Sequence, residues 1–314
     1  MASTKSSDIE FEYSPFLRVY KDGRKERLKF TDYLPPSTDP STGVTSKQIT
    51  IQPSTGVSIR FYLPKDTTPA KKIPLLIYFH GGGWTLETAY SPTYHHYLNS
   101  LAAVANVVAI SVDYRRPPDC DLPIAYQDSW TVLEWIAIHG KEEDDWLKNY
   151  VDFDRVFLAG DSAGADISHN MGVQAGVEGL SGMKIHGIVL VHPYLCGSEK
   201  LESEIGSDFV ENLGKLWIYC CSNPIGLDDP YINPMKNPNF AKLGCEKVLV
   251  CVAGEDDLRD RGKLYCHELG KSGWKGVVEF MVSEGSAHVF HLDNPSSEKA
   301  KELMKRIVSF VNSA

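Results

Sequence analysis

The sequence predicts an α/β fold with a mostly parallel central sheet and helices on both of its faces. Strand-like segments alternate with helical stretches along most of the 314 residues, and this alternation is typical of a parallel sheet. Several strand segments are almost continuously apolar, as expected of strands buried on both faces. The composition, with 42% hydrophobic and 23% charged residues, is that of an ordinary globular chain. We therefore predict a single domain over residues 1–314.

The order of the predicted elements leaves room for a helix between most neighbouring strands. One helix is expected over 124–138, where Trp130, Leu133 and Ile136 are spaced to bury one face. The segments that we assign to strands are near 57–63, 73–80, 106–113, 155–160, 186–191, 247–253 and 277–282.

A motif directly after the strand at 155–160 predicts a nucleophilic serine. Residues 160–164 read Gly-Asp-Ser-Ala-Gly, which fits the Gly-x-Ser-x-Gly pattern of a nucleophile elbow between a strand and a helix. Such a turn strains the backbone of the serine, Ser162, and lifts its hydroxyl above the sheet edge. The pattern is short and arises often by chance. It becomes specific only with an oxyanion hole upstream and an acid and a histidine downstream.

A glycine-rich loop upstream is expected to supply the oxyanion hole. It follows the apolar run at 72–79, and residues 80–83 read His-Gly-Gly-Gly. Consecutive glycines let backbone N–H groups approach a ligand, and together with the amide of Ala163 they can bind the negative oxygen of a tetrahedral intermediate. Three glycines also suit a tight loop without chemistry, but here the loop and the elbow occur together in the right order.

The orienting acid of a catalytic triad is expected in the loop after the strand at 247–253. We choose Asp256, two residues past Gly254, where the chain has just left the strand. Asp260 is expected instead to cap a helix that begins near Arg261. The competing carboxylates in this loop are Glu255, Asp256, Asp257 and Asp260.

The general base is expected after the last strand, at 277–282. His288 lies in the loop that follows this strand, just before a closing helix. A lone histidine in a loop is usually a solvated side chain, but the order Ser162, Asp256, His288, each after a strand, favours the catalytic interpretation. His291 is the close rival, three residues further on.

These residues together predict acyl transfer. His288 would take the proton of Ser162 as it attacks an acyl carbon, and then give it to the leaving alcohol. Asp256 would hold the imidazole in one tautomer and stabilise the imidazolium. We expect no metal and no cofactor, because the histidines form no HExxH motif and the cysteines no CxxC pair.

Segments outside the site carry a resemblance to a known family. These segments are the N-terminal signature at 16–23 and 26–28, and the stretches 113–119, 122–128, 229–234 and 272–276. On these segments the chain resembles the plant carboxylesterases of the hormone-sensitive-lipase branch of the α/β hydrolases, over nearly its whole length. The resemblance implies the α/β-hydrolase fold. It also implies that Gly81, Gly82 and Ala163 donate to the oxyanion, and that His80 is structural.

The resemblance further implies a small cap over the active-site side of the sheet. We assign to it about 1–45, rich in Ser, Thr and Pro, and 196–235. Trp84, beside the oxyanion loop, and Trp217, in the cap, are candidate substrate contacts. For Trp217, plain packing within the cap is at least as good an explanation.

The function we predict is a serine carboxylesterase that hydrolyses a small to medium ester, from plant specialised metabolism such as that of alkaloids or phenolics. The alternative on the same scaffold is a lyase or cyclase, similar to the 2-hydroxyisoflavanone dehydratases or to alkaloid cyclases, or an ester cleavage followed by decarboxylation. A third alternative is a receptor without chemistry, as in the gibberellin receptors, which lack the histidine that stands here as His288. Two departures from the family pattern have effects that the sequence leaves open: Arg116-Pro117 for Leu-Ala, and Asp166 for asparagine.

Charge and composition limit the expected partners to a small-molecule ester. The net charge of −9 and pI near 5.6 argue against nucleic acid. We expect no membrane association, because there is no apolar run of 18 residues. The polar start at 1–10 does not resemble a signal peptide, and the seven scattered cysteines suit reduced thiols in the cytoplasm. A monomer or a dimer is expected.

Overall fold

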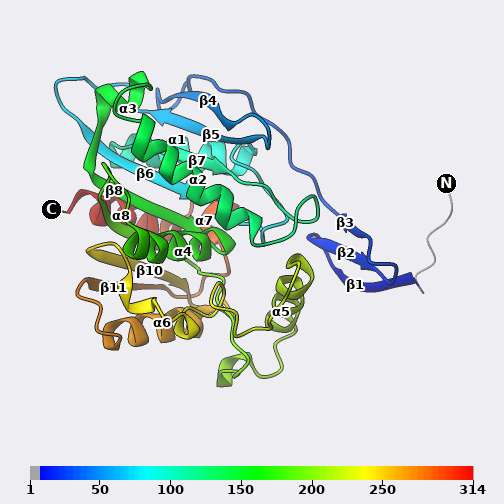
Figure 1. Cartoon of the computed structure of the whole chain (residues 1–314). Helices are drawn as coiled ribbons and strands as arrows, with labels where there is room; N and C mark the ends of the chain where they lie inside the picture. The colour runs from blue at the N-terminus through cyan, green and yellow to red at the C-terminus, as the bar shows by residue number, and fades with distance from the viewer. Residues whose placement is uncertain (1–7, 314) are drawn as a thin grey trace, which may run out of the picture.

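The computed structural model describes residues 8–313 and contains an eight-stranded sheet with the order β11-β10-β9-β8-β6-β7-β5-β4. The pairs from β11 to β7 are parallel, whereas β5 pairs antiparallel with both β7 and β4. The predicted α/β class with a mostly parallel sheet is therefore confirmed (Figure 1). The strands are β4 (Thr45–Gln52), β5 (Val57–Leu63), β6 (Ile73–Phe79), β7 (Val108–Asp113), β8 (Val151–Asp161), β9 (Ile185–Val191), β10 (Lys247–Ala253) and β11 (Val277–Ser283).

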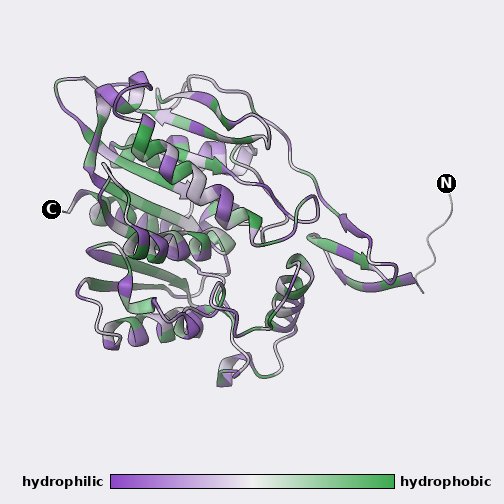
Figure 2. Ribbon diagram, in the orientation of Figure 1, coloured by the Kyte–Doolittle hydropathy of each residue, from purple (hydrophilic) through white to green (hydrophobic). Residues whose placement is uncertain are grey.

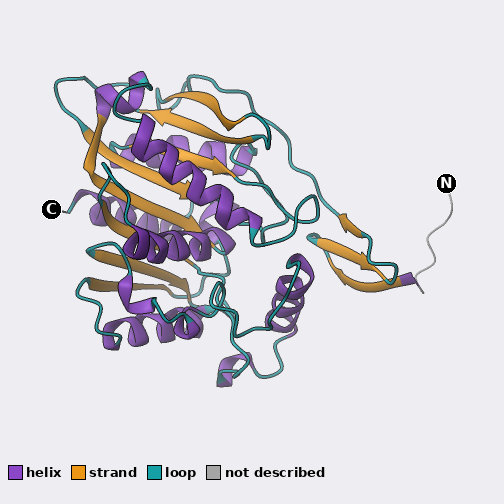
Figure 3. Cartoon of the chain, in the orientation of Figure 1, coloured by secondary structure: helices purple, strands orange, loops and turns teal. Residues whose placement is uncertain are grey.

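Helices cover both faces of this sheet, as Figure 3 shows by element type. Side chains of α2, α3, α4 and α6 pack on one face, and those of α1 and α8 on the other. The helices are α1 (Pro92–Ala105), α2 (Ile124–His139), α3 (Asp145–Tyr150), α4 (Ala163–Glu178), α5 (Asp208–Cys220), α6 (Arg259–Lys271), α7 (Phe290–Asp293) and α8 (Glu298–Asn312).

The central strands are apolar throughout because both of their faces are covered. In β6, Leu75 and Ile77 face one core, and Leu76 and Tyr78 face the other. Figure 2 shows the same pattern as strongly hydrophobic ribbons in the middle of the sheet. All seven strands expected from the sequence are present, and the helix expected at 124–138 is α2.

The start of α6 differs from the expectation. The helix begins at Arg259, so Asp260 lies in its first turn instead of capping it, and forms an ion pair with Arg259. The reason is local: Asp256 turns the chain earlier, since its backbone carbonyl accepts from the N–H of Arg259 at 2.9 Å and its side chain from that of Leu258 at 3.0 Å.

The segments expected to form a cap contain a small antiparallel sheet and helix α5. The sheet consists of β1 (Ile9–Tyr13), β2 (Leu17–Tyr20) and β3 (Lys25–Arg27). It lies beside α5 (Figure 1), where the rings of Phe11 and Tyr219 stack at 4.8 Å. Residues 1–7 of the expected cap lie outside the described residues. That these segments act as a cap stays a prediction.

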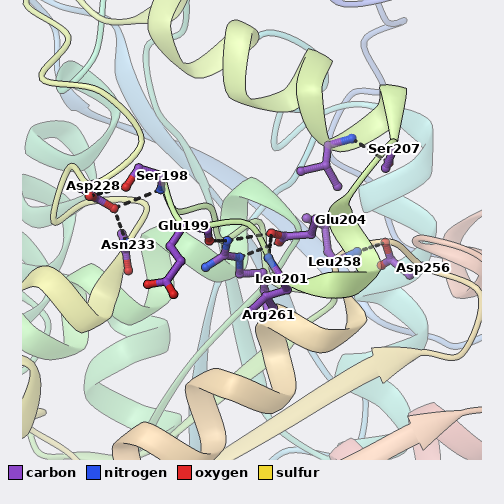
Figure 4. A network of polar contacts seen from close by, with 11 residues as sticks. Ser198, Glu199, Leu201, Glu204, Ser207, Asp228, Asn233, Asp256, Leu258 and Arg261 are labelled. Carbon is purple, nitrogen blue, oxygen red and sulfur yellow. Dashed lines mark hydrogen bonds and ion pairs between the residues drawn. The ribbon is translucent and has the colours of Figure 1, made fainter.

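A buried ion pair anchors the chain that leads to α5. Arg261 donates to both carboxylate oxygens of Glu204, at 2.6 and 2.7 Å, and the two side chains are 4% and 2% exposed. The same guanidinium donates to the carbonyl of Glu199 at 2.6 Å (Figure 4). Removing one partner of such a pair leaves a buried charge unpaired, which costs about 3–5 kcal/mol. The pair therefore holds this segment firmly against α6.

Within residues 8–313, no helix combines the length and the apolar character that crossing a bilayer would require.

Candidate active site

Ser162 occupies the sharp turn between β8 and α4. Its φ of 52° and ψ of −120° belong to a region that side chains rarely adopt. The flanking glycines make the turn possible: a Cβ on Gly160 would lie 2.3 Å from the backbone of Gly164, and one on Gly164 would lie 2.0 Å from the carbonyl oxygen of Phe79. The predicted strand–turn–helix setting of the serine is therefore present.

Ser162, Asp256 and His288 form one chain of hydrogen bonds. Ser162 Oγ donates to Nε2 of His288 at 3.0 Å, and Nδ1 of His288 donates to Oδ2 of Asp256 at 2.6 Å. The Asp256 side chain is 1% exposed and that of His288 is 23% exposed. The other oxygen of Asp256 accepts from a backbone N–H, at Leu258, so the carboxylate is held in orientation. The structure thus brings together three residues from the loops after β8, β10 and β11.

The rival residues are engaged elsewhere or are turned away. Asp257 accepts from the hydroxyl of Ser207, the N-cap of α5, at 2.6 Å. Asp260 pairs with the preceding arginine, and Glu255 is exposed. His291 is buried, and neither of its ring nitrogens has a hydrogen-bond partner. Of the four carboxylates in this loop, Asp256 is the one that is hydrogen-bonded to the imidazole of His288.

His192, at the end of β9, supports the loop that carries His288. Its Nδ1 accepts the backbone N–H of Val289 at 2.9 Å, so the neutral ring carries its proton on Nε2. Burial lowers the pKa of His192 well below its usual range, so the ring stays neutral. The residue itself has a φ of 46°, a conformation that is uncommon outside glycine.

The oxyanion loop requires a correction for Gly81. The N–H of Gly81 donates to Oη of Tyr94 at 2.7 Å, so this amide is already used inside the protein and is not free for an oxyanion. Gly82 and Gly83 line the same cavity as Ser162. Within residues 8–313, no group accepts from the N–H groups of Gly82, Gly83 or Ala163.

Two side chains behind this loop are structural in character. His80 stacks on Tyr114 with 4.3 Å between ring centroids, and burial lowers the pKa of His80 to about 3. Asp161 accepts from the hydroxyls of Tyr78 and Tyr94 at 2.7 and 2.8 Å. Burial raises the pKa of Asp161 to about 6. This polar cluster joins the oxyanion loop, α1 and the residue before the nucleophile.

The cavity beside Ser162 has a volume of about 270 Å³. Phe16 contributes to it from the N-terminal segment, and Phe209 and Leu213 from α5. Residues from both predicted cap segments therefore form part of its wall. The rest of the wall includes Leu86 and Leu292, which keeps much of it apolar.

Trp84 and Trp217 do not line this cavity. Their side chains are 0% and 1% exposed. The two rings pack against one another at 5.2 Å, and Trp84 also packs against Tyr194 at 4.6 Å. Both tryptophans therefore pack in the protein interior, as the alternative explanation for Trp217 expected, and neither is placed for direct contact with a substrate.

Asp166 lies in the first turn of α4, where its backbone N–H donates to the carbonyl of Ser162 at 3.2 Å, but its side chain forms no hydrogen bond with a triad residue. Its carboxylate accepts from Oη of Tyr126 at 2.5 Å and from Nδ2 of Asn170 at 3.2 Å. Burial raises its pKa well above the usual range, and the charge of Asp229 adds to that rise. The departure from the family pattern therefore places in a hydrogen-bonded pocket a carboxyl group that burial makes harder to ionise than usual. The Nε atom of Arg116, at the other departure, is buried without a partner.

A set of three potential metal ligands lies at the site within the described residues. The ligand atoms of His192, Asp256 and His288 are within 4.8 Å of one another. Two of these residues are already joined by the hydrogen bond of the triad, and His192 accepts from Val289. The set is explained by these contacts.

Tyr94, His192 and Gly83 are site residues that sequence reasoning missed. Gly83 belongs to the glycine run that was recognised, so its signal was available. Tyr94 comes from α1 and His192 from the end of β9. Nothing in their sequence surroundings connects them with the nucleophile.

Comparison with known proteins agrees with this geometry. The family model described as "alpha/beta hydrolase fold" matches residues 76–292. "Probable carboxylesterase 7" of Arabidopsis thaliana is 44% identical over 98% of this chain and 99% of its own length. "Probable carboxylesterase 4, mitochondrial" of the same plant is 44% identical over 99% of this chain and 86% of its own length. A "2-hydroxyisoflavanone dehydratase" of Glycyrrhiza echinata is 41% identical over 99% of this chain and 98% of its own length.

A solved structure shares the fold as well. The "Pyrobaculum calidifontis esterase" superimposes with a TM-score of 0.71 and 28% identity, covering 85% of this chain and 84% of its own.

Proposed function

Because the chain belongs to the α/β-hydrolase family and is a carboxylic ester hydrolase of the carboxylesterase type, we propose that it cleaves its ester through an acyl-enzyme on Ser162. The observation that carries this proposal is the continuous hydrogen-bond chain from Ser162 Oγ through His288 to Asp256. A nucleophile, a base and an orienting carboxylate in this arrangement are the elements of a serine hydrolase triad.

The first half of the reaction follows from this geometry. Nε2 of His288 lacks a proton and accepts from Ser162, so it takes the hydroxyl proton as Oγ attacks the ester carbon. The imidazolium that forms is stabilised by the buried carboxylate of Asp256. The imidazolium then protonates the alcohol oxygen as the ester C–O bond breaks. The products of this half are the free alcohol and an ester between the acyl group and Ser162.

The second half repeats these steps with water. His288 takes a proton from water as it attacks the acyl carbon, and returns the proton to Oγ of Ser162 as the acid leaves. The negative oxygen of both tetrahedral intermediates is proposed to bind the N–H groups of Gly82, Gly83 and Ala163. Their lack of protein acceptors supports this assignment, in which Gly83 takes the place first given to Gly81.

The size and lining of the cavity support a small to medium ester. A space of about 270 Å³ with a largely apolar wall suits short acyl groups and not a long triglyceride chain. We propose that Trp84 and Trp217 shape this wall from behind by packing. The similarity to a plant 2-hydroxyisoflavanone dehydratase supports a role in plant specialised metabolism.

A cytoplasmic location is also part of the proposal. All seven cysteines are free thiols, as expected of a reducing compartment. The name of one relative places that protein in mitochondria. A fluorescent fusion of the full chain, imaged with a mitochondrial marker, distinguishes the two locations.

Elimination is the second candidate reaction. The full-length similarity to a 2-hydroxyisoflavanone dehydratase favours it, and a base beside an oxyanion hole can also serve proton abstraction. It requires no acyl-enzyme, so the fate of Ser162 separates the two. A receptor without chemistry has no use for the bond between Ser162 and His288, which makes it the weakest alternative.

The decisive experiment combines active-site labelling with isotope transfer. A fluorophosphonate should label Ser162 alone, as mapped by peptide mass spectrometry, and Ser162→Ala should abolish both labelling and turnover of p-nitrophenyl butyrate. In ¹⁸O water, one label should enter the released carboxylate. A product that contains no water oxygen and is still formed by Ser162→Ala would establish elimination instead.

A further inference from the structure

The catalytic cavity contains a carboxylate that no group within residues 8–313 binds. Glu87 follows the oxyanion loop, and its side chain lines the cavity that contains Ser162. Within residues 8–313, no hydrogen bond or ion pair joins Glu87 to another side chain; the residue is part-exposed, its Oε2 atom is closed off without a partner, and Oε1 is the carboxylate oxygen that remains accessible. Carboxylates that leave water are normally paired. Glu87 therefore has an unused capacity to bind a donor group in the cavity.

The backbone of Glu87 is strained as well. Its φ of 62° is uncommon for a residue with a side chain. Strain of this kind is found where surrounding structure holds a residue for binding or catalysis. Here it keeps the carboxylate beside the cavity.

The charged groups around the cavity favour a cation in its inner part. Lys29 and Asp293 line the cavity but are exposed. Further inside are Glu87 and Asp161, with His288 as the only other titratable group besides tyrosine. Burial raises the pKa of Asp161 to about 6, and the charge of Glu87 adds to that rise. A positive charge bound there would relieve the repulsion between these two carboxylates.

Arg116 is a cation that acts electrostatically on the same tyrosine as Glu87 does. Both residues act electrostatically on Tyr114, Arg116 lowering and Glu87 raising its pKa, while burial is the main cause that raises it. The two form no ion pair, and Nε of Arg116 lacks a partner as well. The carboxylate of Glu87 is thus left for a ligand.

We propose that Glu87 determines specificity by binding an ammonium group of the substrate, so that the preferred substrates are esters that carry a protonated amine. The inference rests on the proposed serine esterase function, and assigns to its cavity a class of substrate. An ammonium group supplies both the charge and the N–H donor that the carboxylate lacks.

The test uses two esters of the same shape. 3-(Dimethylamino)propyl acetate carries a protonated amine at neutral pH, and 4-methylpentyl acetate replaces that nitrogen with carbon. The wild type is expected to prefer the amine ester in kcat/KM by about tenfold or more, and Glu87→Gln to lower this preference by at least about tenfold. Asp293→Asn removes an exposed carboxylate from the same cavity, and should leave the preference within about twofold because solvent screens that charge.

Binding provides a second readout that does not depend on turnover. Calorimetry with 3-(dimethylamino)propanol should show binding to Ser162→Ala that weakens at least about tenfold when Glu87→Gln is added. Should Glu87→Gln fail to fold, Glu87→Asp, which retracts the charge, tests the same preference.

Each failure points to a different proposal. An unchanged preference in Glu87→Gln, an equal loss in Asp293→Asn, or a preference for the anionic ester 4-acetoxybutanoate would overturn the role of Glu87. The last result would instead indicate an anion bound near Lys29. Binding that depends on Glu87 without hydrolysis of any ester would support ammonium binding by Glu87 but refute the esterase function and the class of substrate that rests on it.

Discussion

The amide N–H of Gly81 donates to the hydroxyl of Tyr94 at 2.7 Å, and the same hydroxyl donates to Asp161 at 2.8 Å. One side chain of α1 therefore joins the start of the oxyanion loop to the residue that precedes the nucleophile. Because the hydroxyl accepts one bond and donates the other, both connections depend on the same atom. This relationship explains how two segments far apart in the sequence keep a constant distance at the site.

Removal of that hydroxyl should misplace the oxyanion loop. Tyr94→Phe is expected to lower kcat for p-nitrophenyl butyrate by about 10- to 100-fold, because two buried hydrogen bonds are lost and Gly81 and Asp161 are each left short of a partner. Tyr97→Phe is the matched control, since the Tyr97 hydroxyl is buried without any partner. It should leave kcat within about twofold. Equal losses in both variants would contradict the linkage.

The identity of the triad acid can be tested with two adjacent carboxylates. Asp256→Asn should lower kcat by about 10⁴-fold, because the amide favours the wrong tautomer of His288. Asp257→Asn removes only an acceptor for Ser207 and should stay within about tenfold of the wild type. Steady-state kinetics of the two variants decide the matter. An inactive Asp257→Asn beside an active Asp256→Asn would reverse the assignment.

His192 is expected to act by positioning the loop of His288. His192→Ala removes the acceptor for the N–H of Val289, and should lower kcat by about tenfold or more with little change in KM. His192→Asn restores an acceptor oxygen and tolerates the positive φ of this position. It should recover most of the lost kcat. If the two variants have the same kcat, the hydrogen bond to Val289 has no positioning role.

Asp166 should make the protein less stable as the pH rises. Its folded-state pKa is raised above the unfolded value, so the unfolded chain releases this proton first and folding stability declines with pH between the two values. The decline contributed by this one group approaches about 1.4 kcal/mol per pH unit while the buried carboxyl stays protonated.

The matched comparison for Asp166 is Asp166→Asn, which cannot ionise. Urea unfolding gives the free energy of unfolding of both proteins from pH 5 to 8. As the pH rises, the free energy of unfolding of Asp166→Asn should increase relative to that of the wild type. A difference that is the same at every pH would mean that Asp166 ionises normally in the folded protein.

The strands and the sequence positions of the site could be predicted because their signals are local. Ser162 and Asp256 each follow a buried strand and His288 follows the part-exposed edge strand β11, and the carboxyl ends of parallel strands meet at one edge of the sheet. Short-range patterns were therefore enough to select residues that the structure brings within hydrogen-bond distance. The strand β4 and the small sheet β1–β3 were not predicted. Their strands are short or half exposed, so their pattern of apolar residues is weak.

By itself, the sequence determined the α/β class, the positions of the sheet's main strands along the chain and the strained turn at Ser162, since apolar periodicity and glycine spacing act over a few residues. Only the tertiary structure decided that Gly81 donates to Tyr94, that Asp257 is held by Ser207 and that Trp84 packs behind the cavity. These outcomes depend on which donor reaches which acceptor across the fold. Such contacts join segments far apart in the chain, and no local pattern encodes the distance between them.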